Sequence, residues 1–279
     1  MTVRNLANIS FDELLSCFLA AFENYYVQMP TDKGYYKERW RLAKVDYNYS
    51  YGMFDKNKLV GFIIHAIDKR NGTLIAFNTG TGVLPSYRGK KIVKSIYQFA
   101  LKDLEQNGIE KITLEVIRKN EIAVKTYKSI GFEICKNYQC FTGIINVENT
   151  NHFDLEEVEL SKVKWENLPS QQSYSWDFQK ETILEGNYRF FQIVYKKEFE
   201  SFFIINPVNH YLVQFDVLNA KKNSWQRLFS AIKKYLDTVK VINVDDRFED
   251  KIIQLHNMGL ENFVNQYEME LNIKDGHMN

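Results

Sequence analysis

The spacing of apolar residues near the start of the chain predicts a helix followed by strands. Between residues 11 and 22 apolar side chains recur at intervals of three and four, the spacing of an amphipathic helix. Ser10 and Glu13 can close its first turn as a capping box. A weaker helical pattern covers residues 35–43. Strand patterns then cover residues 50–54, 59–67 and 74–83, and the polar turns between them favour antiparallel hairpins.

The pattern then changes to an alternation of helix and strand. Residues 91–105 place apolar side chains on one helical face and end at Asn107-Gly108. Residues 111–117 alternate as a strand, residues 121–129 form a helical pattern that stops before Gly131, and residues 132–144 are again strand-like. Strand, helix, strand, helix and strand after the hairpins predict an α/β domain, with an α+β mixed sheet, over residues 1–147.

The second half of the chain repeats this order. Strand patterns cover residues 188–195, 200–205 and 211–218, and a helical pattern covers residues 225–236. Shifting residues 111–138 forward by 128 positions aligns strand with strand and Gly131 with Gly259. We therefore predict a second domain, residues 148–279, that is a degenerate copy of the first, with residues 149–171 as linker and first element. A chance match at one offset is the alternative.

Composition limits the class of protein. Lys and Arg number 36 and Asp and Glu 35, so the formal charge of +1 does not favour a nucleic-acid partner. The three cysteines have neither the density of a disulfide framework nor the spacing of a metal site, which favours a reducing compartment and no bound metal. No apolar run approaches the ~18 to 20 residues that a membrane helix needs. We expect a soluble, cytoplasmic protein with no membrane partner.

A basic turn between the third strand and the third helix has the features of a phosphate site. The first amides of a helix that begins near Gly89 have no partner within the helix and can bind an anion. Pro85 stiffens the turn, and Gly89 lets a ligand approach the backbone. Lys90 and Lys91 oppose the helix dipole unless an anion lies between them and the amides. A bound diphosphate resolves this conflict; a solvated basic turn is the alternative.

Residues 82–132 also carry two ordered motifs. Val83, Pro85, Arg88, Gly89 and Ile92 form the pattern V-x-P-x-x-R-G-x-x-I. One helix and one strand later, Asn120, Ala123, Tyr127, Gly131 and Phe132 form the pattern N-x-x-A-x-x-x-Y-x-x-x-G-F. In this order and at this distance, both motifs resemble those of the GNAT superfamily of N-acetyltransferases.

Together with the repeat, the resemblance implies two GNAT-like domains, and it implies a transfer of acetyl from acetyl-CoA to a primary amine by direct attack. Loop amides would hold the CoA pyrophosphate, and divergence of strand 74–83 from strand 111–117 would open a slot for the thioester. Asn120 would hold the pantetheine or the adenosine side. The implied CoA-binding residues are Gly82, Val83, Leu84, Arg88, Gly89, Lys90, Lys91, Ile92, Val93 and Asn120.

Tyr127 is the candidate proton donor. The resemblance places it at the thioester sulfur, and a phenol of pKa ~10 can donate a proton to the departing thiolate. A core tyrosine with a satisfied hydroxyl is the alternative. The base that accepts the proton of the amine is open among Glu115, His65 and Asp46, and we take Glu115 as the candidate.

Two positions depart from the family pattern, and the acceptor is open. The family keeps small residues, mostly glycine, where this chain has Lys91 and Val93. A non-catalytic acyl-CoA or ligand-binding protein is therefore the alternative to an enzyme.

The acceptor is a small-molecule or peptide amine, with the second domain helping to form its site. The oligomeric state is open, although a fused second copy can replace a dimer partner. The polar residues of strand 74–83 that we expect at the acceptor groove are Asn78, Thr79 and Thr81.

Overall fold

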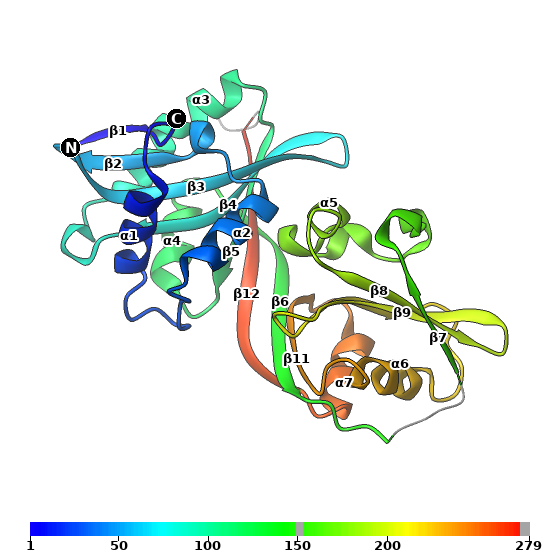
Figure 1. Ribbon diagram of the computed structural model, residues 1–279. Coiled ribbons are helices and arrows are strands. Elements are labelled where there is room, and N and C mark those ends of the chain that lie inside the picture. The colour runs from blue at the N-terminus through cyan, green and yellow to red at the C-terminus, as the bar shows by residue number, and fades with distance from the viewer. Residues whose placement is uncertain (149–152, 274–279) are drawn as a thin grey trace. The chain divides into compact units, whose positions relative to one another are not determined.

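The structure is a computed structural model that describes residues 1–148 and 153–273. It contains two compact units (Figure 1). Unit 1 holds Met1–Cys135 and the chain from Tyr267 onward, and unit 2 holds Lys136–Gln266. These bounds differ from the predicted single boundary after residue 147. The strands β6 (Glu133–Ile144) and β12 (Glu261–Asn272) each contribute residues to both units, so unit 1 is completed by a segment from the far end of the sequence.

Unit 1 is built on a mixed sheet. Its strands follow the order β1-β2-β3-β4-β5-β12. Neighbours from β1 to β4 pair antiparallel, whereas β4 and β5 pair parallel. The hairpins and the parallel crossover through a helix agree with the sequence pattern, but the pairing of the first residues as β1 was not predicted. The bounds are β1 (Thr2–Asn5), β2 (Tyr51–Asp55), β3 (Lys58–Arg70), β4 (Thr73–Val83) and β5 (Lys111–Ile117).

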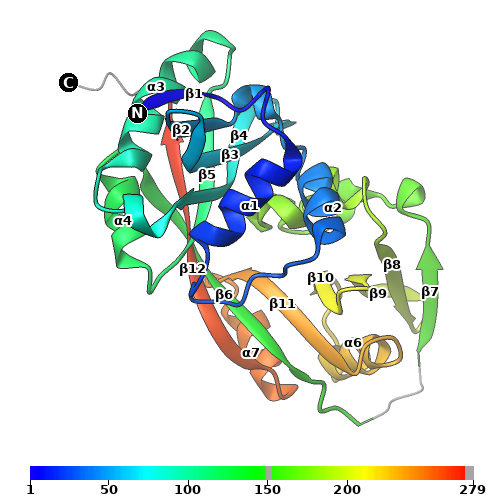
Figure 2. The same ribbon diagram turned by 60° about the vertical axis from the view of Figure 1, so that its left-hand side comes forward.

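Helices cover both faces of this sheet. The helices are α1 (Phe11–Ala21), α2 (Lys33–Ala43), α3 (Ile92–Gln106) and α4 (Glu121–Lys128), with short 3-10 turns at Tyr47–Tyr49 and Pro85–Tyr87. On β3, Phe62 packs with α1 and α2, whereas its neighbour Ile63 packs with α3. Helices α1 and α2 therefore cover one face of the sheet and α3 covers the other (Figure 2). Burial on both faces explains why β3 is an almost continuous apolar run. Ser10 Oγ accepts the amide of Glu13, which is one of the two hydrogen bonds of the predicted capping box and makes Ser10 the N-cap of α1.

Unit 2 repeats the order of elements of unit 1. Three antiparallel strands are followed by a helix, a strand parallel to the third, a second helix and a final strand. The sheet order is β6-β11-β10-β9-β8-β7. Tyr211 of β10 and Lys240 of β11 form the parallel pair. The bounds are β7 (Asp154–Val158), β8 (Arg189–Tyr195), β9 (Glu198–Asn206), β10 (Tyr211–Val217), α6 (Ser224–Lys233), β11 (Thr238–Asp245) and α7 (Glu249–Asn257).

Short helices replace, in unit 2, the two long helices that cover one face of the unit 1 sheet. Side chains of this region, among them Trp165 and Phe178, pack on Phe190 and Phe202 of the sheet. Within the predicted linker, residues 149–152 lie outside the described residues, and β7 and three short turns follow. The short helices are Leu160–Lys162, Trp165–Asn167, Gln171–Ser173, Trp176–Phe178 and α5 (Lys180–Ile183).

A buried ion pair joins β9 to α6 in unit 2. Glu200 is fully buried and accepts from Arg227 at 2.9 and 2.5 Å and from Ser224 Oγ at 2.9 Å. The Arg227 guanidinium lies 3.8 Å from the centre of the Tyr195 ring. Because Glu200 is buried, water cannot replace these partners. The first turn of α6 is therefore held to β9 by a charged contact.

Among residues 1–148 and 153–273, no helix is both long enough and apolar enough to cross a membrane.

Candidate active site

The candidate site in unit 1 lies at the end of β4, beyond the point where β4 and β5 stop pairing. Their parallel ladder runs from Ile75–Lys111 to Asn78–Leu114, although the strands themselves continue to Val83 and Ile117. The predicted divergence of the two strands is therefore present. At the last pair Asn78 donates to the Tyr97 hydroxyl of α3, and beyond it Thr81 lines the same cavity as Tyr127 of α4.

A cleft of about 910 Å³ opens at this end of the sheet. Its walls are the end of β4, the basic turn, the first residues of α3, helix α4 and the segment that follows α1. Of the predicted site residues, Leu84, Lys90 and Glu115 are not among those that line it. Those that do are Gly82, Val83, Arg88, Gly89, Lys91, Ile92, Val93, Asn120 and Tyr127. Their roles stay predictions.

The basic turn presents the start of α3 to the cleft. Gly89 and Lys91 both have left-handed backbone conformations, with φ of +77° and +56°, and α3 begins directly after them at Ile92. The Arg88 guanidinium donates to the carbonyl oxygens of Ala21, at 2.9 Å, and Val83, at 3.3 Å. Arg88 thus connects the turn to the end of α1, where a cation is favourable. The Arg88 side chain does not cover the first amides of α3, which can bind an anion in the cleft.

The left-handed conformation of Lys91 explains the family preference for glycine there and leads to a prediction. We expect Lys91→Gly to raise the free energy of unfolding by about 0.5 to 1 kcal/mol, because glycine avoids the steric cost of a positive φ. Lys90→Gly is the control, since Lys90 has a negative φ, and we expect it to be neutral or destabilising. Urea unfolding measures both. Equal effects of the two substitutions would contradict this account.

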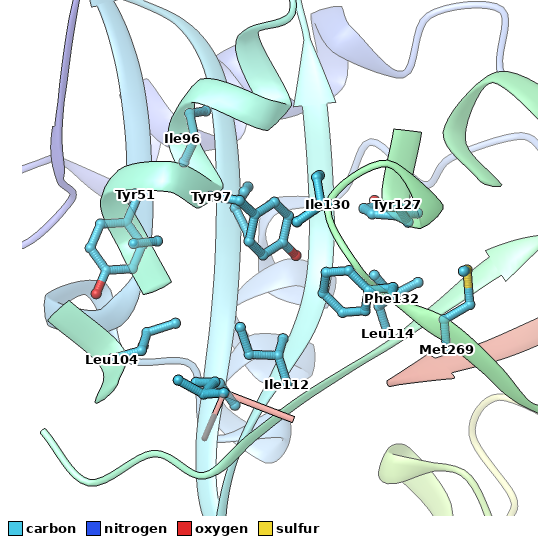
Figure 3. Packing of buried hydrophobic residues seen from close by; sticks show 14 of the residues in the cluster. Tyr51, Ile96, Tyr97, Leu104, Ile112, Leu114, Tyr127, Ile130, Phe132 and Met269 are labelled. Atoms are coloured by element: carbon cyan, nitrogen blue, oxygen red, sulfur yellow. The ribbon is translucent and has the colours of Figure 1, made fainter. Parts of the chain in front are cut away.

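Tyr127 is buried among the side chains at the floor of the cleft. It is 8% exposed, and the Phe132 ring packs edge-on against both Tyr127 and Tyr97, with centroid distances of 5.6 and 5.3 Å (Figure 3). Burial raises the pKa of the Tyr127 phenol to about 12, although hydrogen bonding to Thr81 and Asn78 lowers it in part. The phenol is therefore protonated at physiological pH and is suited to donate, not to accept, a proton.

Asn120 begins helix α4 and contacts a tyrosine that the sequence analysis missed. Its Oδ1 accepts the amide of Ala123 at 3.2 Å, so Asn120 is the N-cap of the helix that carries Tyr127. It also hydrogen-bonds to Tyr25, whose pKa is raised mainly by burial. Tyr25 contributes to raising the pKa of Tyr127, and Tyr127 in turn contributes to raising the pKa of Tyr97. Neither Tyr25 nor Tyr97 belongs to a motif, and only their aromatic character marked them in the sequence.

The candidate bases lie apart from the cleft lining. Glu115 is half-buried on β5, and Asp46 accepts the amide of Asn48 at the start of a 3-10 turn. His65 is fully buried, and its Nδ1 lies 2.6 Å from the carbonyl oxygen of Tyr49. In the described part of the chain, the carboxylate that lines the cleft belongs to Glu23, after α1. Sequence reasoning missed it because Glu23 lies outside every motif.

The burial of His65 predicts a pH dependence of stability. Burial lowers the pKa of His65 to about 4, below its ordinary value of 6.5. Between these two pH values the unfolded chain binds more protons than the folded chain does. The stability that neutral His65 contributes is therefore fully present above pH 6.5 and is lost as the pH falls toward 4. We expect a slope of up to about 1.4 kcal/mol per pH unit in urea unfolding of unit 1. His65→Asn, which keeps a donor for Tyr49, should flatten it; an unchanged slope would exclude His65 as the cause.

Comparison with known proteins identifies the part of the chain that holds the cleft. The model of the acetyltransferase (GNAT) family matches residues 11–132, which include the basic turn, α3 and α4. Residues 11–132 belong to the GNAT family. The family resemblance that the two motifs predicted is thereby confirmed for residues 11–132.

Relatives of this GNAT domain extend the comparison. N-alpha-acetyltransferase MAK3 of Arabidopsis thaliana is 30% identical over 79 residues, which make up 28% of this chain and 42% of that protein. The match therefore spans less than half the length of that curated relative.

Solved structures resemble the chain over almost its whole length. A tandem GNAT protein from the clavulanic acid biosynthesis pathway has a TM-score of 0.70 at 13% identity, covering 98% of this chain and 99% of its own. A GCN5-related N-acetyltransferase from Sphaerobacter thermophilus has a TM-score of 0.68 at 8% identity, covering 98% and 95%. These likenesses confirm the predicted fold, a mixed sheet with helices in each of two GNAT-like domains.

Proposed function

We propose that this protein transfers an acetyl group from acetyl-CoA to a primary amine. The observation that carries the proposal is the cleft itself, where the start of α3 and the phenol of Tyr127 line one cavity at the end of the β4–β5 ladder. The helix start suits a diphosphate, and the phenol suits a leaving thiolate. A phosphate site and a proton donor in one cavity match the two ends of an acyl-CoA.

The charges around the cleft support an anionic donor. Lys91, Lys94 and Arg88 line it near the start of α3, and no acidic residue occupies the first turn of that helix. Cations at a helix start are unfavourable unless an anion binds between them. The cleft also holds apolar area from Ile92 and Ile122, which suits the pantetheine arm.

Binding of the donor tests the first half of the proposal. Isothermal titration with acetyl-CoA and with CoA should give saturable binding that weakens as salt rises, because phosphate contacts are screened. Folding is checked by circular dichroism. A folded protein that binds neither molecule at millimolar concentration would refute the proposal.

Turnover separates an enzyme from a non-catalytic acyl-CoA-binding protein. Release of CoA thiol is measured with a panel of amines, comprising a polyamine, an aminoglycoside and a peptide with a free α-amine. The peptide is included because the plant relative is named as an N-alpha-acetyltransferase. Thiol release that depends on one class of amine supports acetyl transfer. Binding without thiol release on any amine would favour the non-catalytic function, to which the side chains of Lys91 and Val93 at the family's small-residue positions point.

A further inference from the structure

A β-bulge in β4 places two polar side chains on one face of the strand. The register with β3 pairs Ile64 with Gly80 and His65 with Asn78, so Thr79 is an extra residue of β4. In a regular strand, side chains three positions apart point to opposite faces. The bulge removes this alternation, and Asn78 Nδ2 lies 2.7 Å from Thr81 Oγ1.

The orientation of the buried Asn78 amide follows from a backbone group. The N–H of Gly80 can only donate, and it lies 3.1 Å from Asn78 Oδ1, which identifies that atom as the oxygen. The amide nitrogen therefore faces two hydroxyl groups, Thr81 Oγ1 at 2.7 Å and Tyr97 Oη at 2.8 Å. Asn78 is 5% exposed, so water does not compete for these contacts.

The direction of donation continues from Asn78 toward the cleft. An amide nitrogen donates and does not accept, so the Thr81 hydroxyl accepts from Asn78 and keeps its own proton for a second group. Two acceptors are within its reach, Asn78 Oδ1 at 3.1 Å and the Tyr127 phenol. Thr81 and Tyr127 both line the cleft. When the Tyr127 oxygen accepts a hydrogen bond from Thr81, the phenol proton is free to point into the cleft.

We propose that Asn78 and Thr81 are positioning residues that hold the Tyr127 phenol with its proton directed into the cleft. The proposal rests on the acetyl transfer proposed above. In that reaction the amine nitrogen uses its electron pair to form the C–N bond, and the C–S bond breaks with its pair on sulfur. The Tyr127 proton passes to that sulfur, and the proton lost by nitrogen passes to water. Water reprotonates the phenolate after CoA leaves.

A double-mutant cycle tests whether Thr81 acts through Tyr127. Thr81→Val should lower kcat on the order of 10- to 100-fold with KM for acetyl-CoA unchanged. In a Tyr127→Phe background the same substitution should cause no further loss. Thr81→Ser should restore the rate, and Asn78→Asp, which cannot donate to Thr81, should resemble Thr81→Val. Losses that multiply in the double variant would overturn the proposal.

Thr79→Val is the matched control for this cycle. Thr79 Oγ1 is buried without a hydrogen-bond partner in the described ranges. The sequence pattern placed Thr79 at the acceptor groove, but Thr79 is not among the residues that line the cleft, because the bulge separates it from Thr81. Its replacement by an isostere should leave kcat unchanged. A loss equal to that of Thr81→Val would show that β4 tolerates no change here, and would overturn a specific role for Thr81.

A measurement on the resting protein keeps this inference separate from the proposed activity. Tyrosine is labelled with ¹³C at Cζ, and the Tyr127 signal is assigned from its absence in Tyr127→Phe. Thr81→Val should shift this signal and Thr79→Val should not. No shift would overturn the proposal even in an active enzyme. A shift in a protein that releases no thiol would support the hydrogen bond and reject acetyl transfer.

Discussion

Tyr127→Phe is expected to lower kcat for acetyl transfer by on the order of 10² to 10⁴, with KM for acetyl-CoA close to that of the wild type. The substitution removes the only proton that this side chain can supply to sulfur and keeps the ring that packs against Phe132. Thiol release with a saturating amine measures the effect. Isothermal titration of the variant with CoA checks that the cleft still binds.

The raised pKa of Tyr127 adds a pH criterion. Because that pKa is about 12, the phenol keeps its proton up to high pH, and ionisation of Tyr127 should not reduce kcat anywhere between pH 7 and 10. Tyr51→Phe is the control, since Tyr51 is a buried tyrosine of the same core whose hydroxyl bonds to Asp103, at 2.8 Å. It should cost about 1 kcal/mol of stability and no rate. Equal kcat in wild type and Tyr127→Phe would remove Tyr127 from the mechanism.

Glu200→Ala is expected to lower the free energy of unfolding of unit 2 by about 3 to 5 kcal/mol. The substitution leaves the Arg227 guanidinium buried without its carboxylate, and also removes one of the acceptors of Ser224 Oγ. Urea unfolding followed by tryptophan fluorescence measures the loss. Replacing both Glu200 and Arg227 by leucine should recover most of it, because no unpaired charge then remains.

Glu157→Ala is the matched control for the buried pair. Glu157 and Arg189 form a two-bond ion pair at 2.7 and 2.6 Å in the same unit, but their side chains are 47% and 37% exposed. Water screens this pair, so its loss should cost about 0 to 1 kcal/mol. If Glu200→Ala cost no more than Glu157→Ala, burial would not be what makes the Glu200–Arg227 pair important.

The local pattern was enough to predict the elements of the site. The strand predicted at residues 111–117 is β5 (Lys111–Ile117), and the helix predicted at 91–105 is α3, displaced by one residue. The prediction of such segments depends on periodicity and on stop signals such as Gly131, and both can be read directly from the sequence. The spacing from Asn120 to Tyr127 is likewise a property of one helix, so the motif placed both residues at the cleft.

Pairings between distant segments could not be read in this way. The first residues pair with β2 as β1, and β12 completes unit 1 from the far end of the chain. A strand of four residues carries little periodic signal, and its partner is chosen by the edge that the fold leaves open. The placement of Glu115 away from the cleft lining is similar, because alternation along β5 does not say which face meets the site.

By itself the sequence determined the order of the helices and strands between α1 and β6, the repeat of their main elements, and the turn and tyrosine of the GNAT motifs, because each depends on residues close together in the chain. The tertiary structure decided what surrounds Tyr127. The bulge at Thr79 turned Asn78 and Thr81 to one face, and the end of the β4–β5 ladder left them facing Tyr127. Burial then set the pKa of the phenol, and burial is a property of packing between distant segments, not of any one of them.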